Sequence, residues 1–221
     1  MKYVKPDLEL MRRVAGEHSD NEDIALDVYC SENVLFREFF WFRLWMLTRM
    51  IRRLSGGRGT CLDFGGGSGV FMPTLATGFE RVQLIDLNTD QARELKDALS
   101  VDNVTIVSAD IVDHDFGEGK FDAIVAADVL EHFQDLQFPL DRLKRWLADD
   151  GYLFTSLPTE NIFYRGLRIP FRKQKPADHY HTARHVEKRL RDSGFRKVMG
   201  WYHPLFVPLF PLFRISAWQK T

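Results

Sequence analysis

The chain has 221 residues, of which 45% are hydrophobic and 28% charged, a composition typical of a soluble globular domain. Its formal net charge of −1 at pH 7 argues against nucleic acid as a general partner, since nucleic-acid-binding domains are usually basic. Two cysteines, Cys30 and Cys61, are too few for a disulfide framework or a cysteine-based zinc site, so no metal and a reducing cytoplasm are expected. Residues 1–10 lack the apolar core of a signal peptide, and no apolar run is long enough to span a bilayer.

Residues 1–59 are predicted to form a helical arm over the main domain, with helices at 7–15, 21–30 and 33–54. The last helix is amphipathic, since its aliphatic and aromatic residues spread around one side and most of its arginines lie on the other. Such a helix covers a core or, alternatively, lies on a membrane surface. Arg43 projects into the apolar side, where an unpaired guanidinium is costly, so it either reaches past its neighbours to water or points into a site.

The stretch TCLDFGGGSGVFMP, residues 60–73, predicts a short buried strand that turns sharply through glycine into a helix at 68–77. Glycine lets a ligand approach the backbone, and a helix start presents free N–H groups, so a nucleotide-type site is expected. The dinucleotide pattern G-x-G-x-x-G would need its third glycine where Val70 or Met72 stands, and the Gly-Lys-Ser/Thr of a P-loop is absent. The pattern that is present, D-x-G-x-G-x-G, begins at Asp63.

Strands and helices alternate over residues 60–157, which predicts a parallel sheet with helices on both faces. In such sheets ligands bind beyond the carboxyl ends of the strands. Asp86 ends the second strand and could accept both hydroxyls of a ribose there. The expected strands are 60–64, 81–86, 104–108, 121–127 and 152–157, and the expected helices are 68–77, 88–100 and 136–148.

Further titratable residues follow the third and fourth strands. Asp110 lies just beyond residue 108, and the sequence FDAIVAADVLEHFQD places Asp128, Glu131 and His132 within five residues after the fourth strand. Histidine is the side chain that most readily takes up a proton near neutral pH, so His132 is a candidate general base. A loop histidine that only hydrogen-bonds to the backbone is the alternative.

Together these motifs resemble those of the class I S-adenosylmethionine-dependent methyltransferases, in particular the small-molecule, type 11/23-like branch. The resemblance implies an α/β, Rossmann-like fold with a seven-stranded, mostly parallel sheet and helices on both faces. Its antiparallel strand seven would lie between strands five and six. It also implies S-adenosyl-L-methionine as cofactor. The positions that match the family's cofactor-binding residues are Asp63, Gly65, Gly66, Gly67, Gly69, Asp86, Leu87, Asp110, Ile111, Ala127 and Asp128.

The resemblance also suggests residues for the acceptor side. Relatives carry a similar aromatic helix with an arginine just before the glycine loop, which favours a site role for Arg43. His132 is the first candidate for taking the acceptor's proton and His179 the second. The residues assigned to acceptor binding are Arg43, Glu131, Arg165 and Tyr180.

Residues 158–181 form a long connection in which five basic residues lie among aromatic ones. This composition is typical of a lid over an anionic or lipid-linked acceptor, with a solvated basic loop as the alternative. A helix at 183–193 and strands at 195–202 and 214–219 follow. The apolar, proline-rich loop at 203–213 either forms an interface or covers the site.

We therefore expect an arm (1–59) and a methyltransferase domain (60–221) that methylates O or N of a small-molecule or lipid-linked acceptor. A nicotinamide-dependent oxidoreductase is disfavoured by the glycine spacing. A non-catalytic S-adenosylmethionine-binding protein and a membrane-associated assembly protein are the alternatives. A cytoplasmic protein is expected, with residues 34–54, 163–175 and 203–213 as candidates for peripheral membrane contact.

Overall fold

The computed structural model describes residues 1–17, 24–111, 113–159, 180–204 and 211–221. Three helices come first and precede the sheet: α1 (Leu8–Glu17), α2 (Ile24–Cys30) and α3 (Val34–Leu54). The elements that follow are β1 (Thr60–Phe64), α4 (Met72–Ala76), β2 (Arg81–Asp86), α5 (Asp90–Ala98), β3 (Val104–Ser108), β4 (Phe121–Ala127), the 3-10 turn η1 (Leu130–His132), α6 (Gln137–Trp146), β5 (Leu147–Pro158), α8 (Ala183–Asp192), β6 (Phe195–His203) and β7 (Phe213–Lys220).

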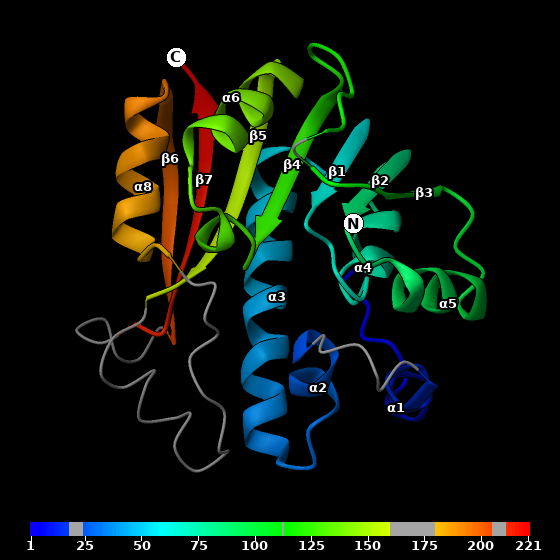
Figure 1. Ribbon diagram of the computed structural model, residues 1–221. Helices are drawn as coiled ribbons and strands as arrows, with labels where there is room; N and C mark the ends of the chain where they lie inside the picture. Colours follow the sequence, from blue (N-terminus) through cyan, green and yellow to red (C-terminus); the bar gives the residue numbers. More distant parts are fainter. Residues whose placement is uncertain (18–23, 112, 160–179, 205–210) are drawn as a thin grey trace.

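The described residues form one seven-stranded sheet with the strand order β3-β2-β1-β4-β5-β7-β6 (Figure 1). Strands β1 to β5 pair in parallel, and β7 runs antiparallel to both β5 and β6. The predicted Rossmann-like fold is confirmed, including the place of its antiparallel strand. Because β1 to β5 are parallel, their carboxyl ends meet at one edge of the sheet, and α1 and α2 lie beyond that edge (Figure 1).

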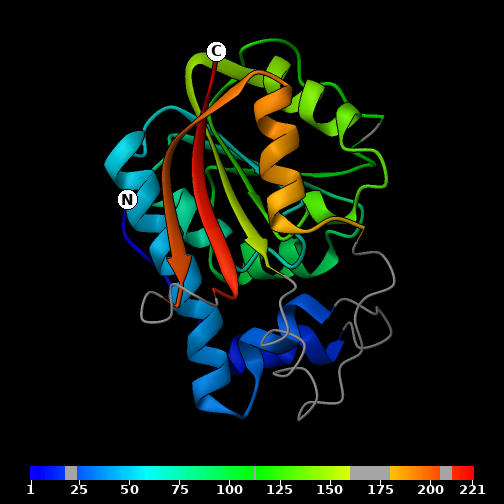
Figure 2. The same ribbon diagram turned by 90° about the vertical axis from the view of Figure 1, so that its left-hand side faces the viewer.

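Helices cover both faces of the sheet. Buried residues of α3, α4 and α5 form one core cluster with strand residues such as Cys61 and Val125. Those of α6 and α8 form a second cluster with the neighbouring residues Leu62 and Ile124, because successive side chains of a strand point to opposite faces. Figure 2 shows α3 on one side of the sheet and α6 and α8 on the other. The first cluster includes residues of α1 and α2, so the arm shares the core of the sheet.

Several predicted boundaries were wrong. The helix expected at 68–77 covers only α4, because Gly69 has a φ of +76°, which a right-handed helix does not allow, while Pro73 lies in the first turn as required. The helix expected at 136–148 ends at Trp146. Leu147 is already extended (φ −68°, ψ 135°) and pairs with Phe121, so β5 starts five residues earlier than the expected strand at 152.

The long helix α3 begins where a capping residue stands. The Asn33 side chain accepts a hydrogen bond from the N–H of Phe36 at 3.1 Å, which satisfies one of the free donors of the first turn.

Within the described part of the chain, no helix has both the length and the apolar character needed to cross a bilayer.

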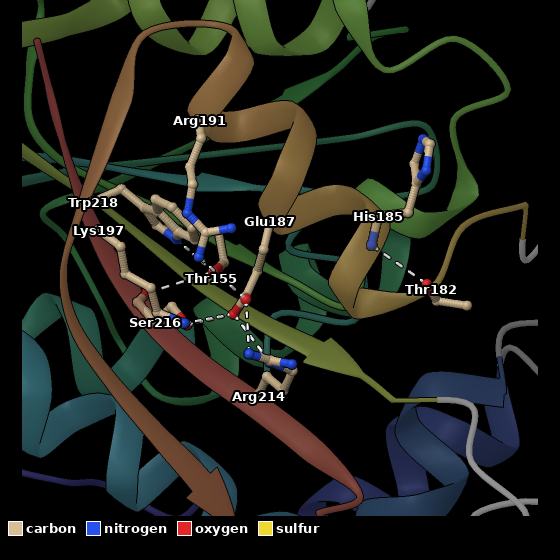
Figure 3. A network of polar contacts seen from close by, with 9 residues as sticks. All are labelled: Thr155, Thr182, His185, Glu187, Arg191, Lys197, Arg214, Ser216 and Trp218. Atoms are coloured by element: carbon tan, nitrogen blue, oxygen red, sulfur yellow. Dashed lines mark hydrogen bonds and ion pairs between the residues drawn. The ribbon is translucent and has the colours of Figure 1, made fainter.

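A buried carboxylate attaches α8 to the two outer strands. Glu187 is 2% exposed and accepts hydrogen bonds from Lys197 (2.6 Å), Arg214 (Nε, 3.2 Å) and Ser216 (3.1 Å) (Figure 3). Arg191 lies at 3.9 Å from its other oxygen. Burial lowers the pKa of Lys197, and the Glu187 carboxylate counteracts this effect. One carboxylate thus holds cations from β6, β7 and its own helix.

We expect Glu187→Ala to lower the free energy of unfolding by about 3 kcal/mol, because the partly buried cations Lys197 and Arg214 lose their buried partner. A matched control on the same helix is Asp192→Ala, which removes an exposed pair with Lys188 (3.5 Å) and should cost at most about 1 kcal/mol. Urea unfolding of the two variants measures the difference. Equal losses would show that the Glu187 contacts add nothing beyond a surface pair.

Candidate methyl-transfer site

The glycine loop after β1 lies at the carboxyl edge of the sheet. The N–H groups of Gly65 and Gly66 donate to the carbonyl of Ile85 over 2.9 and 3.3 Å. At Gly67, by contrast, the nearest described atom to an added Cβ is Asp86 Oδ2 at 4.0 Å, so a ligand can reach the backbone there. Added Cβ atoms on Gly65, Gly66 and Gly69 would instead lie 2.3, 2.5 and 2.9 Å from the side chains of Val129, Leu84 and Ala92.

The ends of β2 and β3 carry the predicted acidic residues. Asp86 accepts hydrogen bonds from the N–H groups of Gly67 (2.8 Å) and Asn88 (3.2 Å), which turns its carboxylate toward the glycine loop. Leu87 beside it is 70% exposed, an unusual state for a large apolar side chain. Asp110 is exposed two residues after β3, and Ile111 is buried in the second core cluster. These residues lie along one edge because Asp86 pairs with Ser108.

Asp63 lies beneath the glycine loop on β1. Its side chain is 3% exposed, and its Oδ2 atom has no hydrogen-bond partner among the described residues. Burial, and then the neighbouring carboxylate of Asp86, raise the pKa of Asp63 from 3.8 to about 7. An unpaired buried oxygen costs free energy, and a ligand that brings a hydrogen-bond donor would remove this cost.

Asp128 and Arg43 form the polar centre of the other half of the edge. Asp128 follows β4 with a φ of +55°, and its N–H donates to the carbonyl of Ser156 at 2.9 Å. Its Oδ2 atom binds the Arg43 guanidinium, which is 3% exposed. Arg43 also donates to the hydroxyl of Ser156 (3.4 Å) and to the phenol oxygen of Tyr29 (2.6 Å). Arg43 thus points to the carboxyl edge of the sheet rather than to water.

Aromatic side chains surround the Arg43 guanidinium. The rings of Phe213 and Phe40 lie 4.7 and 5.7 Å from its central carbon. Burial is the largest single influence on the pKa of Arg43 and lowers it, but Asp128 and Tyr29 together outweigh burial, so the pKa lies above its ordinary value. His203 is buried beside Phe39, with ring centroids 4.1 Å apart, and burial followed by the charge of Arg43 lowers its pKa to about 4. The ion pair therefore lies in an apolar environment, in which its attraction is strong.

Glu131 and His132 belong to η1, the short turn just after Asp128. Glu131 is 1% exposed, and its carbonyl accepts a hydrogen bond from the N–H of Tyr180 at 2.9 Å. The Tyr180 hydroxyl accepts one from Gln134 at 3.0 Å. The structure thus brings Tyr180 to Glu131, two of the residues predicted for the acceptor side, although they lie far apart in the sequence.

Several sequence predictions fall outside the described residues. These include His179, Arg165 and nearly all of the proposed lid at 158–181. The loop predicted at 203–213 is described only at its ends, where His203, Leu212 and Phe213 are buried. Sequence reasoning missed Tyr29 and Ser156. Ser156 lies next to the carboxyl end of the strand expected at 152–157 and could have been found by that position, whereas no local pattern distinguishes Tyr29.

A comparison with known families identifies the chain. The sequence model of a family described as "Methyltransferase domain" matches residues 41–199, about three quarters of the chain. The chain belongs to this methyltransferase family. The match begins within α3 and ends in β6, so it includes Arg43 and every described candidate site residue except Tyr29.

Relatives of this methyltransferase are known from sequence and structure. The (S)-coclaurine N-methyltransferase of Papaver somniferum is 26% identical over 172 residues, which cover 74% of this chain and 46% of that protein. The chain spans less than half the length of the curated relatives it matches. The N-methyltransferase NodS from Bradyrhizobium japonicum WM9, in complex with S-adenosyl-L-homocysteine, has a TM-score of 0.65 at 20% identity, with 96% of both chains covered.

A third similar protein has a bound acceptor. The 1,6-didemethyltoxoflavin-N1-methyltransferase of Burkholderia thailandensis, with bound 1,6-didemethyltoxoflavin and S-adenosylhomocysteine, has a TM-score of 0.64 at 18% identity. The match covers 100% of this chain and 93% of that one. At these identities the structural matches show the fold of the chain.

The raised pKa of Asp63 should make the free energy of unfolding depend on pH. Its carboxyl ionises near pH 4 in the unfolded chain but near pH 7 in the fold, so its contribution to stability is present below pH 4 and is lost as the pH rises to 7. The loss should amount to a few kcal/mol, since one pKa unit corresponds to about 1.4 kcal/mol. Asp63→Asn mimics the protonated acid, so in urea unfolding its stability should match that of the wild type only below about pH 4 and should exceed it by a margin that grows up to about pH 7.

The measurement to compare is the difference in unfolding free energy between the wild type and Asp63→Asn at each pH. His203 has a lowered pKa, so its own contribution is present above its ordinary pKa and is lost as the pH falls toward 4, opposite in sign to that of Asp63. Subtracting the variant from the wild type cancels this contribution. A difference in unfolding free energy that does not vary from pH 5 to 8 would contradict the raised pKa of Asp63.

Proposed function

We propose that this chain transfers the methyl group of S-adenosyl-L-methionine to a nitrogen atom of a small-molecule acceptor. Family membership and the residues at the edge of the sheet support the cofactor. The assignment of nitrogen depends on one observation, the buried Oδ1 atom of Asp128, which has no hydrogen-bond partner among the described residues. The similar coclaurine, NodS and didemethyltoxoflavin proteins are all named as N-methyltransferases, which agrees with it.

The residues along the carboxyl edge fit the parts of this cofactor. The orphaned Asp63 oxygen and the open backbone at Gly67 suit the charged methionine end, and Asp86 suits the hydroxyls of a ribose. The exposed Leu87, with Asp110 and Ile111, would lie against the adenine. Ala127 and Asp128 would lie near the sulfur. When bound, S-adenosylmethionine supplies a methyl group that its sulfonium already activates, so the protein mainly has to orient an acceptor and exclude water.

The Asp128 carboxylate favours an amine over an alcohol. Arg43 holds Oδ2, while Oδ1 is buried and has no hydrogen-bond partner among the described residues. An amine brings N–H donors that satisfy Oδ1, and the carboxylate stabilises the positive charge that develops on nitrogen as the new bond forms. An alcohol must lose its proton to become a strong nucleophile, and a nearby carboxylate opposes negative charge on that oxygen.

The other acceptor-side residues keep their predicted roles within this proposal. His132 is the first candidate to take the proton that the methylated nitrogen releases, and Glu131 and Tyr180 would contact the acceptor. Asp128 already neutralises the charge of Arg43, so Arg43 gives no support to an anionic acceptor. Within the described part of the chain, the exposure of Val34 (55%) and Leu35 (85%) at the start of α3 is what supports a lipid-linked acceptor. Membrane contact through residues 34–54 therefore stays a prediction.

We expect Gly67→Ala to weaken the binding of S-adenosylhomocysteine at least about tenfold, because the new methyl group occupies the open side of the loop. Gly119→Ala is a matched control, since Gly119 also has a positive φ (+61°), no atom within 4 Å of its added Cβ, and a position remote from the site. Both variants should lose about 1–2 kcal/mol of stability. Calorimetry that finds unchanged affinity for Gly67→Ala would place the cofactor elsewhere.

The acceptor class can be tested with a labelled methyl donor and a panel of small primary and secondary amines, each paired with its matched alcohol. Amines should be methylated in preference to their alcohols. Asp128→Asn should lower kcat for the best amine on the order of 100-fold. Calorimetry with S-adenosylhomocysteine shows whether that variant still binds the cofactor product. Preferential methylation of alcohols would overturn the nitrogen assignment.

A further inference from the structure

We infer that Tyr29, on helix α2 of the arm, is a positioning residue of the methyl-transfer site that acts through Arg43 on Asp128. The inference rests on the proposed function, since it gives Asp128 its role toward the acceptor. It makes the arm a working part of the site rather than a cover. Neither the family match nor the sequence motifs include Tyr29.

The contacts form a chain from the arm to the end of β4. Tyr29 is 4% exposed, and its ring packs against Trp41 and Phe40, with centroids at 4.8 and 6.2 Å. Its phenol oxygen lies 2.6 Å from Nη2 of Arg43, while Nη1 of the same guanidinium binds Asp128. Helices α2 and α3 are neighbours along this contact, beyond the carboxyl edge of the sheet (Figure 1).

The direction of this hydrogen bond follows from the chemistry of its partners. A guanidinium only donates, so the phenol oxygen of Tyr29 must accept. Burial raises the pKa of Tyr29, so the phenol stays neutral and adds no second charge to the pair. The Nε atom of Arg43 already has no partner among the described residues. Without the phenol oxygen a second part of this buried cation would lack an acceptor, and the guanidinium would be free to turn about its long side chain.

Turning of the guanidinium would affect Asp128 directly. Asp128 has a φ of +55°, a conformation that is unfavourable for a side-chain-bearing residue and persists only where its surroundings hold it. Its surroundings here are the Ser156 carbonyl, which binds its N–H, and Arg43, which binds its Oδ2. Because Arg43 is in turn fixed by Tyr29, the hydroxyl of Tyr29 sets the orientation in which Oδ1 faces the acceptor.

The test compares two tyrosines of the same arm. Tyr29→Phe removes the hydroxyl that meets Arg43. Tyr3→Phe removes a partly buried hydrogen bond, from Tyr3 to the carbonyl of Trp41 at 2.8 Å, which includes neither Arg43 nor Asp128. Both variants should shift the urea midpoint to a similar extent. Only Tyr29→Phe should lower kcat for an amine acceptor, on the order of 10- to 100-fold, with KM changed less than about threefold.

Two further readouts exclude a merely structural role. The backbone amide signal of Asp128 in a ¹⁵N spectrum should move in Tyr29→Phe and stay in place in Tyr3→Phe. In an Asp128→Asn background, adding Tyr29→Phe should cause little further loss of kcat, because Tyr29 acts through the Arg43–Asp128 ion pair, which Asp128→Asn has already removed. The inference is overturned if the Asp128 signal does not move, or if the two effects on kcat multiply.

These outcomes separate this inference from the proposed function. If the wild type methylates no amine, the acceptor assignment fails by itself, and Tyr29 is still judged by the Asp128 signal, which needs no acceptor. If amines are methylated and Tyr29→Phe retains the kcat of Tyr3→Phe, the acceptor assignment stands and the role of Tyr29 is rejected.

Discussion

The half of the site that we propose for the acceptor depends on the ion pair between the buried Arg43 and Asp128. A guanidinium that is 3% exposed would be strongly destabilising without a charged partner. Asp128, at the end of β4, is that partner, and aromatic rings of α3 and β7 cover the guanidinium. The pair therefore fixes the long helix α3 against the edge of the sheet. It also occupies one oxygen of Asp128 and leaves the other for a ligand.

The half that we propose for the cofactor depends on a different constraint, the close packing of the glycine loop. Three of its glycines lie so near Val129, Leu84 and Ala92 that no side chain fits, and this packing presents the remaining one, Gly67, to the open side. Asp86 accepts the N–H of Gly67 and so links the loop to the next strand. Parallel pairing of β1, β2, β3 and β4 then aligns both halves of the site along one edge.

Much of the fold could be predicted because its determinants are local. Alternating strands and helices, the glycine turn and the acidic residues at strand ends depend on neighbours in sequence, and all seven expected strands are present. The errors were at boundaries. Residues 68–71 were expected to be helical because they continue an apolar run, but the positive φ of Gly69 delays the helix. Leu147 leaves α6 early because pairing with Phe121 on β4 takes precedence over its helical propensity.

The sequence by itself determined the family, the order of the strands and the positions of the cofactor candidates, since these follow from short motifs and their spacing. It also showed that Arg43 interrupts an apolar surface, but not what the guanidinium binds. Only the tertiary structure decided that, because Tyr29, Arg43, Asp128 and Ser156 come from four separate elements. The same holds for Glu187, whose partners lie on β6 and β7. A buried charge is costly unless an opposite charge lies beside it, and the packing of the elements determines which residue can be that partner.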